Sequence, residues 1–357
     1  MDRNTVDVYE ARAREWLDQK ARPIPPSLAA FAARVPPGSF RLDLGCGPGW
    51  HTPALGAPAI AGDAAKAMLD LVPEYAPDAF RVIADLEALP FGPGALGGAW
   101  AHKCYMHIAA ARVPLALSDL HRAMLVGGAL HVHLTSDRAA PVEPDARFGG
   151  RHFDNWPLER LVDVVVGAGF TIESTFDDGE EWIDVEATRA RTLADTVGPD
   201  MRLLIVGLNP SEYSADAGHG FARPGNRFWP AALESGLVTR AHDPVHALRV
   251  DGIGMTDLVK RATPRADELT REEFVEGAQR LERLVSWLKP RATCFVGLSG
   301  YRAAVNRKAV AGWQPEPFGS RPAYVMPNTS GLNAPAKPAD LAEHLRAASS
   351  AGLPFPN

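Results

Sequence analysis

Three acidic residues in the first half of the chain stand at the ends of successive apolar runs. Asp43 lies in the run 40–44, Asp63 follows it by 20 positions, and Asp85 ends a third run. The first run leads directly into a turn that contains Gly45, Gly47 and Gly49. Glycine lets backbone approach a ligand closely, and a carboxylate after the next strand can bind ribose hydroxyls. An acid in the turn repels pyrophosphate and suits an ammonium group. The pattern predicts a nucleoside-cofactor pocket, although the glycine turn alone also fits a plain strand-to-helix connection.

Two asparagine-bearing loops in the second half predict another pocket. The loop 207–211, Gly-Leu-Asn-Pro-Ser, follows an apolar strand, so Asn209 would lie at the carboxyl edge of a sheet, where α/β proteins bind ligands. The loop 326–333, Met-Pro-Asn-Thr-Ser-Gly-Leu-Asn, follows the last apolar run, and Phe221 lies in a small-residue loop between them. These residues predict a polar pocket beside an apolar wedge. Asn209 alone also fits a turn residue whose side chain caps backbone groups.

Three further side chains near the first pocket could take part in chemistry. His102, Cys104 and His107 follow the fourth apolar run of the first half. Imidazoles and thiols serve as general bases and nucleophiles. Lining of the pocket explains the same residues equally well.

The elements that would position the first pocket alternate between strands and helices. Residues 1–34 have helical spacing and are interrupted by prolines near 23–26, which predicts a lid or an outer helix pair. The alternation predicts a Rossmann-like, doubly wound α/β sheet. We expect strands at 40–44, 59–61, 81–84, 99–101, 129–134, 169–176 and 182–187. We expect helices at 64–71, 110–124 and 158–168.

The second half begins a new, smaller α/β domain with a short parallel sheet. Residues 191–200 lack an apolar pattern and end in Gly-Pro-Asp, so we expect a linker there, between domains at 1–190 and 201–357. We expect strands at 201–206, 292–296 and 323–326. We expect helices at 228–234, 271–288 and 339–348.

Composition limits the classes of protein that the chain can be. The 357 residues carry a formal net charge of −6, which divides into −9 for residues 1–199 and +3 for residues 200–357. The acidity argues against a nucleic-acid-coating protein but applies to one half only. The three cysteines have no spacing for a disulfide framework or zinc, so we expect no metal. No segment is typical of a signal peptide or membrane span, and a reducing cytoplasm fits best.

The first half resembles the class I S-adenosylmethionine-dependent methyltransferases over about residues 8–188. The glycine turn, the acids after the second and third strands, and a Gly-Gly turn before the fifth strand carry the resemblance. The matching segments are Leu42-Asp-Leu-Gly-Cys-Gly-Pro-Gly49, Gly62-Asp63, Met68-Leu69, Ala84-Asp85, Leu89-Pro-Phe91 and Val126-Gly-Gly-Ala-Leu130.

This resemblance implies S-adenosyl-L-methionine as the cofactor. Asp43 and the three glycines would contact its methionine part, Asp63 its ribose, and Asp85 with Leu86 its adenine. The segment 101–108 lacks the signatures of the enzymes that methylate amino groups or cytosine C5 in nucleic acids, which argues against DNA methylation. The methyl acceptor stays open.

The second half resembles the uracil-DNA glycosylase superfamily, in its mismatch-specific uracil/thymine branch, from Met201 to about Ala348. Besides the two asparagine loops, the segments 254–259, 263–264, 273–281 and 289–290 are similar to that branch. The resemblance implies excision of a base that has been turned out of the duplex, without cofactor or metal. Residues around the loops, Arg223, Arg227, Lys260, Arg261 and Arg265, would face phosphates, and surface solvation explains each of them equally well.

The resemblance assigns roles within the two loops. Asn209 would position the attacking water, and Asn328 would support the leaving base. Phe221 would stack on the extruded pyrimidine, and Leu332 would enter the vacated position in the duplex. The base-binding set is Gly207, Leu208, Pro210 and Phe221. The loop that enters DNA is Ser330, Gly331, Leu332 and Asn333. Because the family commonly has a polar or basic residue after the wedge leucine, the segment 333–337 puts mismatch selectivity and thymine removal in question.

The sequence therefore predicts a bifunctional repair-type protein. Its first domain would bind S-adenosyl-L-methionine and methylate an unidentified acceptor. Its second would hydrolyse the glycosidic bond of uracil, or of a modified pyrimidine, in double-stranded DNA. Two alternatives remain: a DNA-binding module that recognises a modified base with little excision, and a protein whose main activity is small-molecule methylation.

Overall fold

The chain folds into two compact units, Met1–Ala190 and Arg191–Asn357. The computed structural model describes residues 1–18, 23–139, 149–331 and 337–350. Both units are mixed α/β, which confirms the predicted fold class. Across the described residues, no helix combines the length and the apolar character that crossing a membrane needs.

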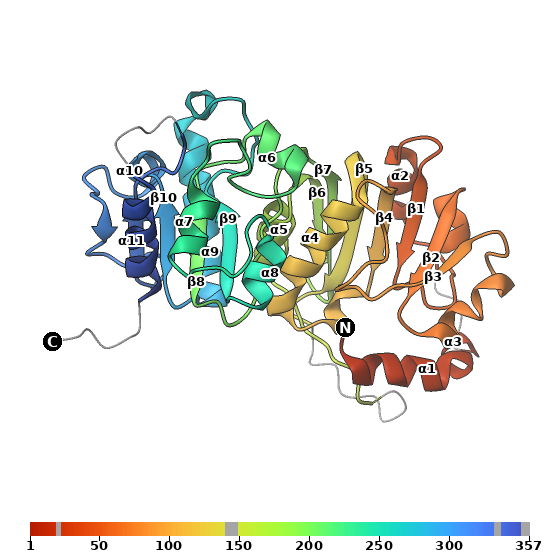
Figure 1. The fold of residues 1–357 in the computed structure, drawn as a ribbon. Helices are drawn as coiled ribbons and strands as arrows, with labels where there is room; N and C mark the ends of the chain where they lie inside the picture. Colours follow the sequence, from red (N-terminus) through yellow and green to blue (C-terminus); the bar gives the residue numbers. More distant parts are fainter. Residues whose placement is uncertain (19–22, 140–148, 332–336, 351–357) are drawn as a thin grey trace. The chain divides into compact units, whose positions relative to one another are not determined.

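The first unit is built on a seven-stranded sheet with the order β3-β2-β1-β4-β5-β7-β6 (Figure 1). Strands β1 to β5 run parallel, and β7 runs antiparallel to both of its neighbours. The strands are β1 (Phe40–Leu44), β2 (Ala59–Asp63), β3 (Phe80–Ile83), β4 (Leu96–His102), β5 (Met124–Thr135), β6 (Phe170–Asp177) and β7 (Trp182–Arg189).

The strand order of this sheet reverses between β1 and β4. From β1 the chain proceeds to β2 and β3 on one side, and then returns to place β4 and β5 on the other. In an open α/β sheet, a crevice forms at such a reversal, outside the carboxyl ends of the strands. The glycine turn leaves β1 at this point, as the sequence predicted.

Helices pack against the sheet. They are α1 (Arg3–Asp18), α2 (Pro26–Arg34), α3 (Lys66–Leu69), α4 (Val113–Ala123) and α5 (Leu158–Gly167). Of these, α1 and α3 contribute side chains to the crevice. Phe31 of α2 packs on Trp100 of β4 with ring centroids 5.3 Å apart. Leu17 of α1 and Met68 of α3 belong to one buried apolar cluster, which anchors α1 beside the carboxyl end of β2.

The second unit has a separate five-stranded sheet with the order β11-β12-β10-β8-β9. Four strands are parallel, and the two-residue edge strand β11 is antiparallel. The strands are β8 (Leu203–Gly207), β9 (Ile253–Asp257), β10 (Thr293–Val296), β11 (Gly312–Trp313) and β12 (Ala323–Met326). The helices are α6 (Glu212–Ala217), α7 (Phe228–Glu234), α8 (Pro244–Arg249), α9 (Arg271–Leu288), α10 (Leu298–Ala304) and α11 (Pro338–Ser349).

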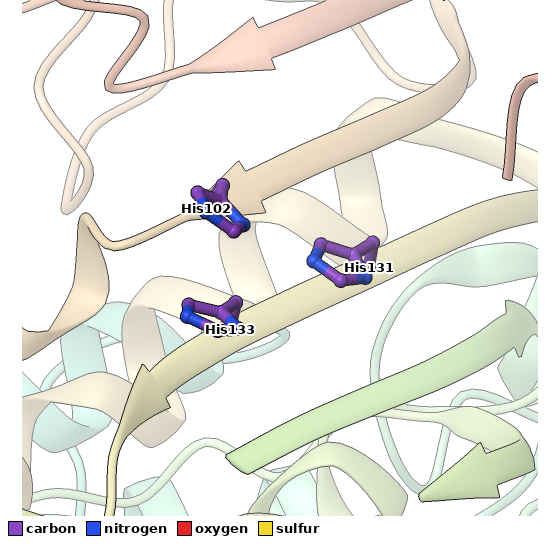
Figure 2. A group of neighbouring side chains, drawn as sticks. All are labelled: His102, His131 and His133. Carbon is purple, nitrogen blue, oxygen red and sulfur yellow. The ribbon is translucent and has the colours of Figure 1, made fainter. Parts of the chain in front are cut away.

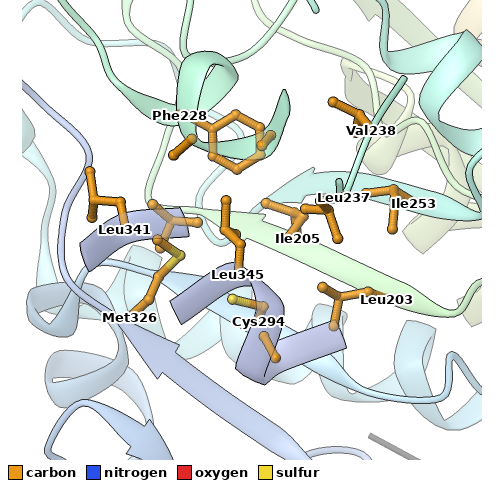
Figure 3. Packing of buried hydrophobic residues seen from close by; sticks show 14 of the residues in the cluster. Leu203, Ile205, Phe228, Leu237, Val238, Ile253, Cys294, Met326, Leu341 and Leu345 are labelled. Carbon is orange, nitrogen blue, oxygen red and sulfur yellow. The ribbon is translucent and has the colours of Figure 1, made fainter. Parts of the chain in front are cut away.

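Successive side chains of each strand in the second unit point to opposite faces of its sheet, so two separate layers of helices pack on it. Leu203 and Ile205 of β8 face α7 and α11, whose Phe228, Leu341 and Leu345 complete one core (Figure 3). On β10, Cys294 belongs to the same core, whereas its neighbour Phe295 packs on Tyr301 of α10. Because successive side chains of a strand point to opposite faces, helices are needed on both sides of this sheet.

Residues 191–200, where we expected a linker, lie within the second unit. Asp195 is 2% exposed, and its carboxylate accepts hydrogen bonds from Lys260 (2.8 Å), Arg280 (2.8 Å) and Thr256 (2.6 Å). Burial raises the pKa of Asp195, but Arg280 and Lys260 outweigh it, and the pKa falls below its usual value. The segment is thus fixed to the sheet of the second unit by buried charge pairs.

Candidate functional site

The glycine turn after β1 has a shape that only glycine fits. Gly45 has a φ of +68°, and a Cβ atom there would lie 2.4 Å from the Cβ atom of Cys104. Gly47 and Gly49 also have positive φ angles, +54° and +85°. Non-glycine residues pay a conformational cost in this region. At Gly45 and Gly47 the turn therefore presents backbone to the crevice.

Asp43 places a buried carboxyl group at the base of the crevice. It is 3% exposed, and its Oδ2 accepts a hydrogen bond from the Thr52 hydroxyl at 2.6 Å. Burial raises the pKa of Asp43 to about 7; Thr52 opposes the rise and Asp63 adds to it. A carboxyl group that is costly to ionise alone is well suited to a cationic ligand group.

Asp63 and Asp85 lie after neighbouring strands, as predicted, and both already have partners. Asp63 accepts hydrogen bonds from the backbone N–H groups of Gly47 and Ala65, each at 2.9 Å. Burial raises the pKa of Asp63 above its usual value. Asp85 accepts from the amino group of Met1 at 3.0 Å and from Glu87 N at 2.9 Å. Asp63 thus ties the glycine turn to the next strand.

A cavity of about 290 Å³ lies above the carboxyl ends of β1, β2 and β4. Five of the predicted cofactor residues line it: Asp43, Gly45, Gly47, Asp63 and Leu86. Gly49 and Asp85 are not among the lining residues. Helix α1 contributes Tyr9 and Trp16 to the opposite wall. The predicted cofactor residues are therefore mostly brought together around one cavity.

Of the three candidate reactive side chains beside this cavity, His107 has both ring nitrogens within hydrogen-bonding distance of other groups. The two ring nitrogens of His107 lie 2.7 Å from the carbonyl oxygen of His152 and 3.1 Å from the hydroxyl of Tyr9. Burial lowers the pKa of His107 to about 4. Burial also raises the pKa of the Cys104 thiol, which disfavours the nucleophilic thiolate. His107 is therefore a tether between α1 and the segment at 152, and a role for it as a general base is not supported.

In the second unit, hydrogen bonds fix the amide of Asn209 in one orientation. Its Nδ2 donates to the carbonyl oxygen of Arg261 at 3.0 Å and to Oγ1 of Thr263 at 2.8 Å. The Thr263 hydroxyl in turn donates to the carbonyl oxygen of Arg265 at 2.8 Å, so it can only accept from Asn209. No described residue donates a hydrogen bond to Oδ1 of Asn209. That oxygen is available to orient a water molecule.

Phe221 lies beside Gly207 at the end of β8. The Phe221 ring stacks on Phe228 with centroids 4.1 Å apart and an interplanar angle of 19°. A Cβ atom on Gly207 would lie 3.7 Å from this ring and 2.2 Å from Oδ1 of Asp257. Glycine at 207 therefore keeps open the space between an aromatic ring and a carboxyl group.

Asp257 is a site residue that the sequence reasoning missed. It ends β9 and is the cross-strand partner of Gly207. Burial raises the pKa of Asp257 to about 6, while Lys260 opposes the rise. The signal was available, because Asp257 ends the apolar run 253–256, but we did not recognise that run as a strand.

Arg227 joins the second asparagine loop to the segment that carries Phe221 and Phe228. Its backbone N–H donates to Thr329 O at 3.0 Å, and its Nη2 donates to Ser330 O at 2.8 Å. Asn328 is exposed, and its Oδ1 accepts from Ser330 N at 2.8 Å. Gly331 lies against the carbonyl of Gly225. Leu332 and Asn333 lie outside the described residues.

Leu208 and Pro210 hold the first loop in place. A Cβ atom on Gly300 would lie 2.5 Å from a methyl group of Leu208, so the Leu208 side chain packs against α10. The carbonyl oxygen of Pro210 accepts from Thr263 N at 3.1 Å. The structure thus gathers Gly207, Leu208, Asn209, Pro210 and Phe221 at the carboxyl ends of β8 and β9.

The basic residues around these loops differ in their availability. Lys260 has a 10% exposed side chain and pairs with Asp195, so our interpretation of it as a phosphate contact is wrong. Arg261 pairs with Glu273, and Arg265 with Asp267. Arg223 is exposed and donates to a backbone carbonyl. Lys260, Arg261 and Arg265 are therefore engaged in ion pairs within the second unit.

Family models match both units. A model of the uracil DNA glycosylase superfamily matches residues 194–348, and a model described as a methyltransferase domain matches residues 42–132. The chain joins a methyltransferase domain to a uracil DNA glycosylase superfamily domain. This confirms the two resemblances at the level of those families. The glycine turn, Asp43 and Asp63 lie within the methyltransferase match, and both asparagine loops lie within the glycosylase-superfamily match.

Solved methyltransferase structures resemble part of the chain. One is the 1,6-didemethyltoxoflavin-N1-methyltransferase of Burkholderia thailandensis, at 16% identity and a TM-score of 0.42, covering 52% of this chain and 88% of that one. Another is a TehB-like SAM-dependent methyltransferase of Corynebacterium glutamicum, at 20% identity and a TM-score of 0.39, covering 52% and 97%.

Proposed function

We propose that the chain is a bifunctional enzyme. The first unit binds S-adenosyl-L-methionine and methylates an acceptor that the sequence does not identify. The second unit hydrolyses the N-glycosidic bond of uracil, or of a modified pyrimidine, in double-stranded DNA and leaves an abasic site. The observation that carries the excision proposal is the fixed Asn209 amide with its Oδ1 available.

The residues around the first cavity fit S-adenosyl-L-methionine. Gly45 and Gly47 line the cavity and would let a ligand lie against the backbone. The carboxylate of Asp43 would pair with the ammonium group of the methionine part, and Asp63 would accept hydrogen bonds from the ribose. Leu86 would pack on the adenine, and Asp85 would exchange the amino group of Met1 for the adenine amino group. The bound cofactor supplies an electrophilic methyl group.

Calorimetric titration of the full chain with S-adenosyl-L-methionine tests this assignment. We expect one site per chain, and a clear loss of affinity in Asp63→Ala. Asp70→Ala is a suitable control, because Asp70 is an exposed carboxylate on the same unit whose salt bridge is with Lys66. Absence of binding by the wild type, or equal binding by Asp63→Ala, would refute the cofactor proposal.

For excision, Asn209 would orient a water molecule toward C1′ of the extruded nucleotide. The water oxygen would bond to C1′ while the C1′–N1 bond breaks, and the electron pair would leave with the base as an anion. An amide orients water but cannot accept its proton, so the proton passes to solvent and we expect modest turnover. Donors near Asn328 would support the negative charge on the leaving base.

The residues around Gly207 would recognise the extruded base. Phe228 covers one face of the Phe221 ring, and the extruded pyrimidine would stack on the other. The wedge role of Leu332 and the contribution of Asn333 rest on the resemblance. The preference for mismatched uracil rests on the same ground.

A labelled duplex with one uracil opposite guanine tests the second proposal. After incubation with the full chain and alkali treatment, we expect a strand break at the uracil and none in a duplex with cytosine there. A gel-shift measurement on the same duplexes separates the alternative. Selective binding without any strand break would favour a recognition module, and neither binding nor cleavage would refute both.

A further inference from the structure

Three histidines lie together on one side of the first sheet. His102 ends β4, and His131 and His133 alternate along β5, so all three point to the same face (Figure 2). One ring nitrogen from each lies within 4.8 Å of the others. His133 and His102 are cross-strand partners, with ring centroids 4.1 Å apart.

Two carboxylates on the next strand hold two of these rings. His131 faces Glu186 of β7, and His133 faces Asp184, as cross-strand partners. In both pairs Nδ1 of the imidazole meets a carboxylate oxygen, at 2.6 Å for His131. The other oxygen of Glu186 accepts from Arg34 at 2.7 Å. A carboxylate on Nδ1 fixes the tautomer in which Nε2 carries the free electron pair.

One nitrogen of each of the three rings is buried and lacks a hydrogen bond. These are Nε2 of His131, Nε2 of His133 and Nδ1 of His102. His131 is 0% exposed and His133 is 8% exposed. A buried acceptor without a donor lowers the stability of the folded state, and three of them in one place indicate a missing electrophilic partner.

We infer that His102, His131 and His133 bind a divalent transition-metal ion, most suitably Zn²⁺. Three imidazoles, two of them hydrogen-bonded to carboxylates, form a typical catalytic zinc ligand set that leaves a position for water or a ligand. The cluster contains no thiolate and no directly ligating carboxylate. This inference rests on the histidines alone and is independent of the proposed cofactor and of the glycosylase proposal.

Binding requires the cluster to contract and the rings to turn. Tetrahedral zinc with zinc–nitrogen bonds of about 2.0–2.1 Å holds two nitrogens about 3.3–3.4 Å apart. The widest separation here, up to 4.8 Å, would therefore close by up to about 1.5 Å. The three ring planes lie within 18° of parallel, so rotation of the rings would have to turn their nitrogens toward one ion.

The position of the cluster gives the ion a route to ligands. His102 and Lys103 line the cavity together with Trp182, whose ring stacks over His133 with centroids 4.9 Å apart. An ion on the three nitrogens would lie at the wall of this cavity. The free coordination position of the ion would suit an oxygen or nitrogen donor. We therefore expect the ligand to be a small molecule in the cavity that carries such a donor.

Metal titration of the full chain, produced without a polyhistidine tag and stripped with a chelator, tests the inference. We expect one equivalent of Zn²⁺ by calorimetry, and Co²⁺ absorption bands typical of a low-coordinate nitrogen site. His102→Gln and His133→Gln should each weaken binding by more than about 100-fold, and Glu186→Gln by about 10- to 100-fold. His121→Gln is the matched control, because His121 is also a buried histidine of this unit but lies outside the cluster.

Each outcome decides the matter. Failure of the stripped wild type to bind either Zn²⁺ or Co²⁺ would overturn the inference whatever the variants do. Binding that the two ligand variants retain, or that His121→Gln loses equally, would also overturn it. Circular dichroism of every variant shows whether it is folded. If both glutamine variants fail to fold, X-ray absorption on the zinc-loaded wild type decides: three imidazole ligands support the site, and other ligands contradict it.

Discussion

The amide nitrogen of Asn209 and the hydroxyl of Thr263 are 2.8 Å apart, and the Thr263 hydroxyl is itself a donor to Arg265 O. This chain of hydrogen bonds assigns the donor and acceptor sides of Asn209, which sequence alone cannot do. Thr263 is 3% exposed, so solvent cannot replace the contact. The water-orienting role that we propose for Asn209 would thus depend on a residue 54 positions away in the chain.

Thr263→Val should therefore slow excision without weakening DNA binding. Valine keeps the volume of threonine but offers no acceptor to the amide of Asn209. Loss of one hydrogen bond of about 1 kcal/mol predicts a roughly fivefold fall in the single-turnover rate. Thr293→Val, a buried threonine in β10 whose hydroxyl lies 3.4 Å from a backbone carbonyl, is the control. Equal falls in the excision rate from the two substitutions would show that Thr263 does not position Asn209.

Gly45→Ala should destabilise the first unit more than Gly47→Ala. Both positions have positive φ, so both variants pay a backbone cost of about 1 kcal/mol. Only at 45 would the new methyl group lie 2.4 Å from Cys104, whereas nothing lies within 4 Å at 47. Chemical unfolding without ligand, followed by tryptophan fluorescence, measures the difference. Similar losses of stability would show that the turn relaxes freely at Cys104.

Affinity for S-adenosyl-L-methionine should decrease as pH falls below about 7. The pKa of Asp43 is raised to about 7 by burial, so below that pH the carboxyl group is protonated and cannot pair with an ammonium group. The ligand amino group stays charged there, which predicts a Kd that rises up to about tenfold for each pH unit. Calorimetry from pH 8 to 5.5 measures this. In Asp43→Asn the slope should vanish, and a slope that persists would assign the titration elsewhere.

Asp195→Ala should strongly destabilise the second unit. Removal of this carboxylate leaves the buried Arg280, 5% exposed, without its counter-charge, at a cost of about 3–5 kcal/mol. The matched control is Asp267→Ala, which breaks an exposed pair with Arg265 and should cost little stability because solvent screens it. Urea unfolding of both variants compares the losses. A small effect at 195 would mean that water reaches Arg280.

The sequence was sufficient where local chemistry determines structure. The run 40–44 with the glycines at 45, 47 and 49 predicted a strand, a turn and a ligand crevice, because positive φ angles there demand glycine. The family matches agree with that reading. The domain with Asn209 was found in the same way, from a strand that ends in a loop of rare composition.

What the sequence could not supply depends on strand register. His131-Val-His133 is a visible alternation, but only the pairing of β5 with β4 and β7 brings His102, Glu186 and Asp184 beside it. We predicted no metal from the cysteine and histidine spacing, and the cluster escaped that search. Lys260 was taken for a surface cation because its partner, Asp195, lies in a segment that we expected to be a linker.

Base release from a uracil·guanine duplex tests the proposed glycosylase activity directly. Under single-turnover conditions, we expect the wild type to convert the duplex to an abasic site, and Asn209→Ala to do so about 100-fold more slowly or worse. Asn306→Ala, in which the changed asparagine caps a turn elsewhere in the same unit, should match the wild type. Equal rates for the wild type and Asn209→Ala, or no abasic site from the wild type, would contradict the proposed glycosylase activity.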